Sequence, residues 1–315
     1  MTSQRAVVTG GAGFIGSNLV DRLVDEGFDV LVIDDLSSGS LANLKDARSR
    51  GNVTIHQIDV TDDRVVGLVR DFRPNSIHHL AAQIDVRMSV SDPVRDARIN
   101  ILGTLNMLEA ARHCDAERFV FASSGGATFG DTFNIPTPET QKRRPGSPYG
   151  VSKFVVEEYF RYYSDTHGLD YVSLGFANVY GPRQDPHGEA GVVAIFIGDL
   201  VGGRTPTIYG DGSQTRDFVY VEDVTDAMLR ASRIGGSRYL NIGTGVETSI
   251  AKLFEVVVEA TGSDIAPVMA AGRRGEQLRS CLDASAARAH LGWEAWTPMH
   301  EGIAETVRWW RGAAR

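Results

Sequence analysis

The amino-acid sequence predicts an α/β protein, with a doubly wound parallel sheet and a smaller mixed α/β domain on its C-terminal side. Three features predict this class. A short apolar run at residues 6–8 leads through a glycine-rich turn directly into an amphipathic segment. Apolar runs then alternate with amphipathic stretches as far as residue 177, the order typical of β-α-β units. Beyond Gly181-Pro182 this rhythm changes, which predicts a second domain.

The glycine-rich turn predicts a site for a dinucleotide. Gly10, Gly13 and Gly16 are three residues apart. That spacing allows a tight turn, brings backbone N–H groups against a pyrophosphate, and lets the following helix pack closely on the strand. An apolar stripe with i, i+4 spacing from Ile15 to Val24 predicts that helix.

The second apolar run indicates which dinucleotide is bound. It extends from Val30 to Ile33 and ends in Asp34. A carboxylate at this position can accept hydrogen bonds from both hydroxyls of the adenosine ribose, and it would repel a 2′-phosphate. The sequence therefore favours NAD over NADP as the cofactor.

The next two segments are expected to surround the adenosine. Residues 36–39 form a polar turn, and residues 41–50 predict a solvated helix that covers the adenosine. A third strand is predicted over 53–60, with Asp59 near its carboxyl end. Open α/β sheets bind ligands at that edge, so we expect Asp59 to lie near the adenine.

A helix over 62–72 and a fourth strand over 76–82 follow. The small residues Ala81 and Ala82 would permit close approach of the cofactor. The adjacent pair His78-His79 points to opposite faces of a strand, a poor arrangement for joint metal ligation. We interpret both histidines as structural and predict no metal site.

The fifth strand is expected to end at the active site. Residues 92–113 carry a helical apolar stripe, and Asn100 lies off that stripe, where it could reach the cofactor. Residues 118–122 predict a strand, and Ser123 to Gly126 follow at its carboxyl end, where active sites of this architecture lie. Residues 129–148 are rich in proline, threonine and charge and predict an irregular loop.

A helix predicted over 149–167 carries the residues with catalytic chemistry, and a sixth strand follows over 171–177. Tyr149 and Lys153 would share one face of the helix, one turn apart. The ammonium group and the positive charge of an oxidised nicotinamide would both stabilise a phenolate. Tyr149 is therefore a candidate general base, and Ser124 could hold the substrate hydroxyl.

The C-terminal part is predicted to be smaller and mixed. Its expected elements are a helix over 190–202, strands over 207–209, 216–221 and 239–242, a helix around 250–258 and a last helix around 303–310. No repeat or linker separates it from the first part, so we expect a shared cleft that admits the substrate. We assign 1–177, with a returning segment at about 221–246, to the cofactor domain, and 178–220 and 247–315 to the substrate domain.

Composition limits the function classes. The chain has 315 residues, 42% hydrophobic and 23% charged, which is ordinary for a globular protein. A net charge of −8 argues against a broad nucleic-acid surface, although the basic pair Arg273-Arg274 could hold a phosphorylated small molecule. Cys114 and Cys281 lack metal or disulfide spacing. We find no cleavable leader and no apolar stretch of membrane-spanning length, so we expect a cytoplasmic protein.

The chain resembles the extended short-chain dehydrogenase/reductase family. The motifs that carry the resemblance are Thr9-Gly-Gly-Ala-Gly-Phe-Ile-Gly-Ser17, His79-Leu-Ala-Ala-Gln83, Ser123-Ser124 and Tyr149-Gly-Val-Ser-Lys153. Within this family it is most similar to UDP-glucose 4-epimerases and related nucleotide-sugar epimerases, through Ala177-Asn-Val-Tyr-Gly-Pro-Arg-Gln184, Arg216-Asp-Phe-Val-Tyr-Val221 and Asn241-Ile-Gly-Thr-Gly245. The resemblance extends over nearly the whole chain and implies a Rossmann-type sheet.

The resemblance also implies the ligand-binding residues. Together with the residues argued above, those expected to bind NAD are Gly10, Gly13, Phe14, Ile15, Gly16, Asp34, Asp35, Ser38, Gly39, Asp59, Val60, Leu80, Ala81, Ala82, Gln83, Asn100, Ser123, Tyr149 and Lys153. Those expected to bind a UDP-sugar are Ser124, Tyr149, Asn178, Val193, Tyr209, Arg216, Arg273 and Glu276. The resemblance implies that NAD stays bound, and that helices near 92–113 and 149–166 form a homodimer interface.

The sequence departs from the family pattern at three places. Phe129 stands where many relatives have tyrosine, and Gly175 stands where an arginine is frequent. Gly125-Gly126 replaces the Asp-Glu pair of related dehydratases, and the glutamate of related decarboxylases is also absent from this stretch. Arg183 either meets a charged sugar or caps its own loop, and we favour the structural role.

The resulting hypothesis is an NAD-dependent isomerase of carbohydrate metabolism that inverts C4 of a UDP-hexose, of the UDP-glucose/UDP-galactose type, through a 4-keto sugar. The sugar could instead be N-acetylglucosamine or glucuronic acid. The nearest enzymatic alternative is a nucleotide-sugar 4,6-dehydratase or decarboxylase, which begins with the same oxidation. A non-catalytic NAD-sensing regulator is the alternative outside enzymes, and the intact Tyr149 and Lys153 disfavour it.

Overall fold

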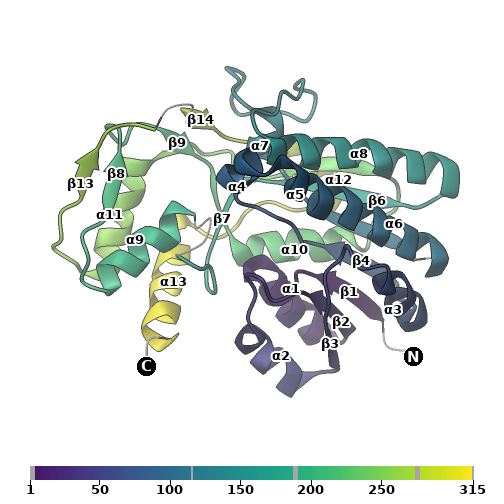
Figure 1. Cartoon of the computed structure of the whole chain (residues 1–315). Coiled ribbons are helices and arrows are strands. Elements are labelled where there is room, and N and C mark those ends of the chain that lie inside the picture. The colour runs from purple at the N-terminus through teal and green to yellow at the C-terminus, as the bar shows by residue number, and fades with distance from the viewer. Residues whose placement is uncertain (1–3, 115, 187–190, 274–276, 314–315) are drawn as a thin grey trace.

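A seven-stranded parallel sheet organises the N-terminal part of the molecule (Figure 1). The computed structural model describes residues 4–114, 116–186, 191–273 and 277–313. The strands of the sheet are β1 (Arg5–Thr9), β2 (Asp29–Asp34), β3 (Val53–Gln57), β4 (Ser76–His79), β5 (Arg118–Ser124), β6 (Tyr171–Phe176) and β11 (Arg238–Ile242). Their order is β11-β6-β5-β4-β1-β2-β3, and each strand runs parallel to its neighbours.

Helices cover both faces of this sheet, which confirms the doubly wound prediction. They are α1 (Phe14–Asp25), α2 (Lys45–Arg50), α3 (Arg64–Phe72), α6 (Gly103–Cys114), α8 (Pro148–His167), α10 (Val221–Ala231) and α12 (Ser285–Leu291). One apolar core packs α1, α10 and α12 against the sheet, with Leu19 and Met228 fully buried. A second core packs α3, α6 and α8 on the opposite face, with Leu108 and Phe160 fully buried.

The strand order reverses at β1, which lies between β2 and β4. The connection after β1 leads to β2 on one side of it, whereas the connection after β4 leads to β5 on the other side. Ligands of doubly wound proteins bind in the crevice outside such a reversal. The glycine-rich turn of residues 10–13 lies at this point.

The remaining elements form a smaller part with its own apolar core, at the left of Figure 1. Its helices are α9 (Val192–Val201), α11 (Ile250–Thr261) and α13 (Met299–Ala313). Short strands pair around them: β7 (Asn178–Tyr180) with β10 (Phe218–Tyr220), β8 (Thr207–Tyr209) with β13 (Val268–Ala270), and β9 (Thr215–Arg216) with both β12 (Thr248–Ser249) and β14 (Arg279–Ser280). The change of rhythm after residue 181 thus marks a real change of architecture.

Several local predictions were wrong. The segment 92–113 is not one helix, because a π-helical turn, η2 (Arg98–Leu102), separates α5 (Pro93–Ala97) from α6. Two short helices were missed: α4 (Val86–Ser91), capped by Asp85, and α7 (Gly125–Phe129), capped by Ser124. Residues 41–50 divide into a 3₁₀ turn, η1 (Leu41–Leu44), and α2. Within the part that the structure describes, no helix has the length and apolar character needed to span a bilayer.

Candidate active site

The glycine-rich turn is packed so closely that side chains are excluded from it. Gly10 has a φ of 67°, and a Cβ atom there would lie 2.8 Å from the backbone nitrogen of Ala81. A Cβ on Gly16 would overlap the carbonyl oxygen of Gly10. The backbone after β1 therefore lies directly against the segment after β4 and against the first turn of α1. This is the bare N-terminal helix turn that a pyrophosphate requires.

Asp34 lies at the carboxyl end of β2 and is 6% exposed. Its Oδ2 accepts from the N–H of Ala12 and its Oδ1 from the N–H of Leu36, both at 2.8 Å. Burial raises the pKa of this carboxyl, and the two backbone hydrogen bonds oppose that rise. Each carboxylate oxygen keeps a further acceptor position, so the group can still receive two ribose hydroxyls.

The other residues expected near the adenosine follow the carboxyl ends of β2 and β3. A Cβ on Gly39 would lie 3.0 Å from Asp34 Oδ1, whereas Asp35 and Ser38 are exposed. Asp59 lies two residues beyond the end of β3, and its Oδ1 accepts from the N–H of Thr61 at 2.8 Å.

A hydrogen-bonded chain that the sequence analysis did not foresee joins β1, β4 and the π-helical turn. Thr9 Oγ1 lies 2.7 Å from His79 Nδ1, and His79 Nε2 lies 2.9 Å from Thr104 Oγ1. Asn100, within η2, accepts from the N–H of Gln83 at 2.8 Å and donates to the Gln83 carbonyl at 2.9 Å. The π turn thereby directs the Asn100 amide at the backbone after β4. His79 has a structural role, because both of its ring nitrogens have hydrogen-bond partners within the fold.

Asp96 is a buried carboxylate that the sequence analysis missed. It is 1% exposed and accepts from Gln83, Asn100 and Ser152, with the Ser152 hydroxyl at 2.5 Å. The sequence does contain a sign of this burial. Asp96 precedes Ile99 by three residues, so it occupies a position of the helical stripe that is otherwise apolar.

Tyr149 and Lys153 lie on the first turns of α8. Ser147 caps this helix by accepting from the N–H of Gly150, with Pro148 as its first residue. Lys153 Nζ lies 6.0 Å from the centroid of the Tyr149 ring and donates to the carbonyl of Ala122 at 2.9 Å. The phenol and the ammonium group thus lie together at the carboxyl end of β5.

Lys153 is only 4% exposed. Burial lowers its pKa to about 8, and the negative charges of Asp96 and Glu157 oppose that fall. The side chain therefore carries a proton at neutral pH and loses it in mildly alkaline solution.

The two serines at the end of β5 point to different environments, because side chains alternate along a strand. Ser123 is 4% exposed, and its hydroxyl donates to Glu157 Oε1 at 2.9 Å. Ser124 is half-buried, and its Oγ caps α7 by accepting from the N–H of Ala127 at 3.4 Å. Of the two hydroxyls, that of Ser124 is the one not committed to a buried carboxylate.

The residues expected at a UDP-sugar are spread over the smaller part. The Arg273 guanidinium stacks on the Tyr209 ring, with its Cζ 3.9 Å from the centroid. Arg216 is half-buried in β9 and donates to the Thr215 carbonyl at 2.8 Å. Asn178, at the start of β7, is exposed.

Two of these expectations need separate comment. Val193 is 1% exposed in the apolar core beneath α9, so its side chain is not available to a ligand, and only its backbone could contribute. Glu276 lies outside the described residues.

The departures from the family pattern have local explanations. Arg183 forms an ion pair with Asp21 at 2.6 Å, in agreement with a structural role. A Cβ at Gly175 would collide with the Tyr239 hydroxyl, so no side chain fits at that position. Phe129 is buried and lies edge-on to the same Tyr239 ring, with the ring centroids 6.3 Å apart.

Comparison with known proteins identifies the family. A family model described as GDP-mannose 4,6 dehydratase matches residues 7–306. The chain belongs to this family. This family belongs to the extended short-chain dehydrogenases/reductases, and its members include nucleotide-sugar epimerases as well as dehydratases.

The chain is 46% identical to the UDP-glucose 4-epimerase of Mycolicibacterium smegmatis, over 99% of this chain and 100% of that protein. It is 42% identical to a UDP-glucose 4-epimerase of Thermotoga maritima solved with UDP-glucose, with a TM-score of 0.95 over 99% of this chain and 100% of that one. The Thermus thermophilus UDP-glucose 4-epimerase solved with NAD is also 42% identical, with a TM-score of 0.90 over 98% of this chain and 100% of that one.

Proposed function

We propose that this protein is an NAD-dependent isomerase that inverts C4 of a UDP-hexose of the UDP-glucose/UDP-galactose type through a transient 4-keto sugar. The observation that carries the proposal is the pairing of Tyr149 with the buried Lys153 at the carboxyl end of β5, the strand that ends in Ser124. The reversal point of the same sheet has the features of a dinucleotide site. Full-length similarity to UDP-glucose 4-epimerases supports it.

The residues at the strand reversal fit NAD. The side-chain-free turn at Gly10 and Gly16 would receive the pyrophosphate, and the buried Asp34 would receive the adenosine ribose. Lys153 is placed to hold the nicotinamide ribose. When bound, NAD would supply the acceptor for the hydride of C4 and, in its reduced form, the hydride donor for the second half of the reaction.

Tyr149, Lys153 and Ser124 perform the proton chemistry. The Lys153 ammonium lowers the cost of a Tyr149 phenolate, which takes the proton of the C4 hydroxyl. Ser124 orients that hydroxyl toward the phenolate. Once the 4-keto sugar has rotated in the site, hydride adds to the opposite face of C4 and Tyr149 returns the proton to O4, which gives the inverted C4 alcohol. Arg216 and Arg273 would hold the UDP diphosphate during this rotation.

The glycine pair after β5 favours epimerisation over dehydration, even though the family model is named after a dehydratase. Dehydration needs groups that take a proton from C5 and give one to the leaving C6 hydroxyl. Gly125 and Gly126 offer neither. A Cβ on Gly125 would lie 2.5 Å from Leu282 Cδ1, so a side chain at this position would require Leu282 to move.

Product analysis tests the proposed function. The purified protein, supplied with NAD, is incubated separately with UDP-glucose, UDP-N-acetylglucosamine and UDP-glucuronic acid. We expect the C4 epimer of one of them, without net formation of NADH. A panel that returns only unchanged sugars would favour the non-catalytic NAD-binding alternative.

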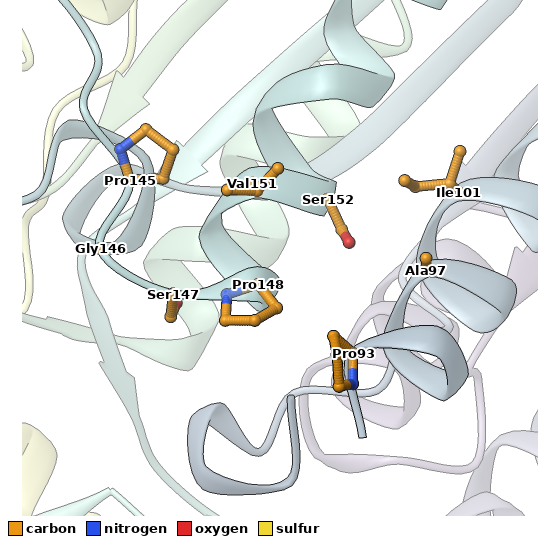
Figure 2. Close-up of a pocket in the computed structure, with 9 residues that line it drawn as sticks. All are labelled: Pro93, Ala97, Ile101, Pro145, Gly146, Ser147, Pro148, Val151 and Ser152. Atoms are coloured by element: carbon orange, nitrogen blue, oxygen red, sulfur yellow. The ribbon is translucent and has the colours of Figure 1, made fainter. Parts of the chain in front are cut away.

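We also propose that two copies of the chain form a homodimer through α5, η2 and α8. Figure 2 shows an open hollow of about 490 Å³ between Pro93, Ala97 and Ile101 on one side and Pro148 and Val151 on the other. On these elements and on the neighbouring α4, large apolar side chains face solvent, namely Val90, Val94, Leu102, Val151 and Tyr162. An apolar face of this kind is typical of an obligate interface, and a second copy would bury it.

The dimer prediction is tested by light scattering. The wild-type protein should have twice the 34.2 kDa mass of the chain, and Leu102→Glu should reduce it to one chain, because a charge cannot be buried unpaired in an apolar interface. Val268→Glu, at an equally exposed apolar position on β13, is the matched control and should remain dimeric. A monomeric wild type would contradict the proposal.

The proposed assignment of the chain also includes its two domains and its compartment. We divide the chain into a cofactor domain, 1–177 with 221–246, and a sugar-nucleotide domain, 178–220 with 247–315. The pairing of β11 with β6 supports this division, whereas α12, within 247–315, packs against the sheet of the cofactor domain. Cytoplasmic localisation is consistent with the free thiols of Cys114 and Cys281.

A further inference from the structure

A buried ionic cluster lies directly behind the proposed catalytic residues. Glu157 follows Lys153 by one turn on the same face of α8 and is 9% exposed. Its Oε1 accepts from the hydroxyls of Ser123 at 2.9 Å and Ser173 at 3.2 Å, and its Oε2 forms an ion pair with Arg143. One carboxylate thus joins two neighbouring strands, β5 and β6, to α8 and to the loop of residues 130–147.

Arg143 is held in this cluster by aromatic rings. Its side chain is 12% exposed, and its Cζ lies 3.9 Å from the centroid of Tyr239. The rings of Phe129 and Phe154 flank the guanidinium, with centroids 5.7 and 5.6 Å from Cζ. A planar guanidinium can stack on a ring and pair with a carboxylate at the same time, which a lysine cannot do equally well.

The absence of a side chain at position 175 makes room for this arrangement. Gly175 is the partner of Ser123 in the β5–β6 register, and the Tyr239 hydroxyl occupies the place of its Cβ. The Tyr239 ring can then lie under the guanidinium of Arg143. Within the described part of the chain, Arg143, on the loop of residues 130–147, is the one basic residue that forms an ion pair with Glu157. The guanidinium that pairs with Glu157 therefore comes from the loop and not from β6.

We propose that Glu157, held by Arg143, is a positioning residue that fixes the carboxyl end of β5 against α8 and so sets the mutual placement of Ser124, Tyr149 and Lys153. Glu157 touches no substrate and acts through Ser123, the neighbour of Ser124. The inference rests on the proposed function for its catalytic consequence. Its structural part, the fixing of β5, stands independently.

The test compares kcat and KM of folded variants. Glu157→Gln keeps the size of the side chain and an acceptor for Ser123, but it removes the charge and leaves Arg143 unpaired. We expect kcat to fall on the order of 10- to 100-fold, because small displacements of reacting groups have effects of this size, with KM for the UDP-sugar within about twofold. Arg143→Lys should retain more of kcat than Arg143→Met, because it keeps the charge that Glu157 requires.

A matched control is available at the other end of the same strand. Arg118 forms a 2.9 Å ion pair with Asp170, and its side chain is 10% exposed. Arg118→Gln should lower the melting temperature without changing kcat, because this pair lies at the amino end of β5. If Glu157→Gln fails to fold, Ser123→Ala is the alternative, because it removes one of the hydroxyls that donate to Glu157 without leaving a charge unpaired. This variant should show a smaller fall in kcat, again with little change in KM.

Hydrogen exchange separates this inference from the proposed function, because it needs no substrate. In Glu157→Gln, the backbone amides of 120–130 should exchange faster than in the wild type, and in Arg118→Gln the change should be confined to the opposite end of the strand. An inactive wild type would overturn the proposed function, and exchange would then decide the inference alone. Unchanged exchange together with wild-type kcat in Glu157→Gln would overturn the positioning role.

Discussion

Replacement of Tyr149 with phenylalanine is expected to lower kcat by about 10²- to 10⁴-fold, the range that a positioned general base contributes. The ring would remain at the start of α8, so NAD and UDP-sugar should bind as before. Tyr163→Phe is the matched control on the same helix, because its hydroxyl donates to Glu109, away from the proposed site. It should retain wild-type kcat. Steady-state rates with a UDP-hexose measure both variants.

The pH dependence of the same reaction follows from Lys153. Its pKa is lowered to about 8, so the ammonium that stabilises the Tyr149 phenolate is mostly present near pH 7 and is lost as the pH rises through this value. We therefore expect kcat/KM to decline on this alkaline side. A Tyr149→Phe variant with wild-type kcat, or a rate that stays level well above the pKa of Lys153, would contradict the assigned roles.

Removal of the two arginines of the smaller part is expected to have the second largest effect. Arg216→Ala and Arg273→Ala should each weaken UDP binding by about 1.5–3 kcal/mol, the contribution of a hydrogen bond to a charged group. That loss corresponds to roughly 10- to 150-fold in Kd. The Arg273 side chain already stacks on Tyr209, which orders the guanidinium before the nucleotide arrives. Titration calorimetry with UDP measures the affinity.

A third arginine provides the control for this experiment. Arg204 lies in the same part of the molecule, is exposed, and pairs with Asp199 at 2.9 Å. Its replacement by alanine should leave the affinity for UDP unchanged. If neither Arg216→Ala nor Arg273→Ala changes the affinity for UDP, the proposal that the smaller part of the molecule binds UDP is wrong.

Much of the fold and part of the site could be predicted because the signals are local. The Gly10 turn, the acid at the end of β2 and the Tyr149–Lys153 pair each lie within one short segment whose neighbours follow from strand and helix geometry. The structure places them in the predicted elements, at the predicted edge of the sheet. The π-helical turn at Asn100 could not be predicted, because its amide geometry depends on the Gln83 backbone after β4.

Longer-range packing explains what the sequence could not reveal. The sequence shows Gly175 as a departure from the family pattern, and the structure shows that the hydroxyl of Tyr239, on β11, fills the space that a side chain would need. Likewise, Glu157 meets Arg143 and Ser123 only because α8, a loop and β5 converge. The burial of Val193 is of the same kind, since it depends on the core that α9 shares with α11 and α13.

The central claim is that hydride leaves C4 of the sugar and returns to the other face of the same carbon. The measurement that tests it most directly uses a UDP-hexose deuterated at C4, with mass spectrometry and NMR of the product. Retention of deuterium at C4 with inverted configuration is the predicted result. A 4-keto-6-deoxy sugar, loss of carbon dioxide, or exchange of the C4 deuterium with solvent would contradict it.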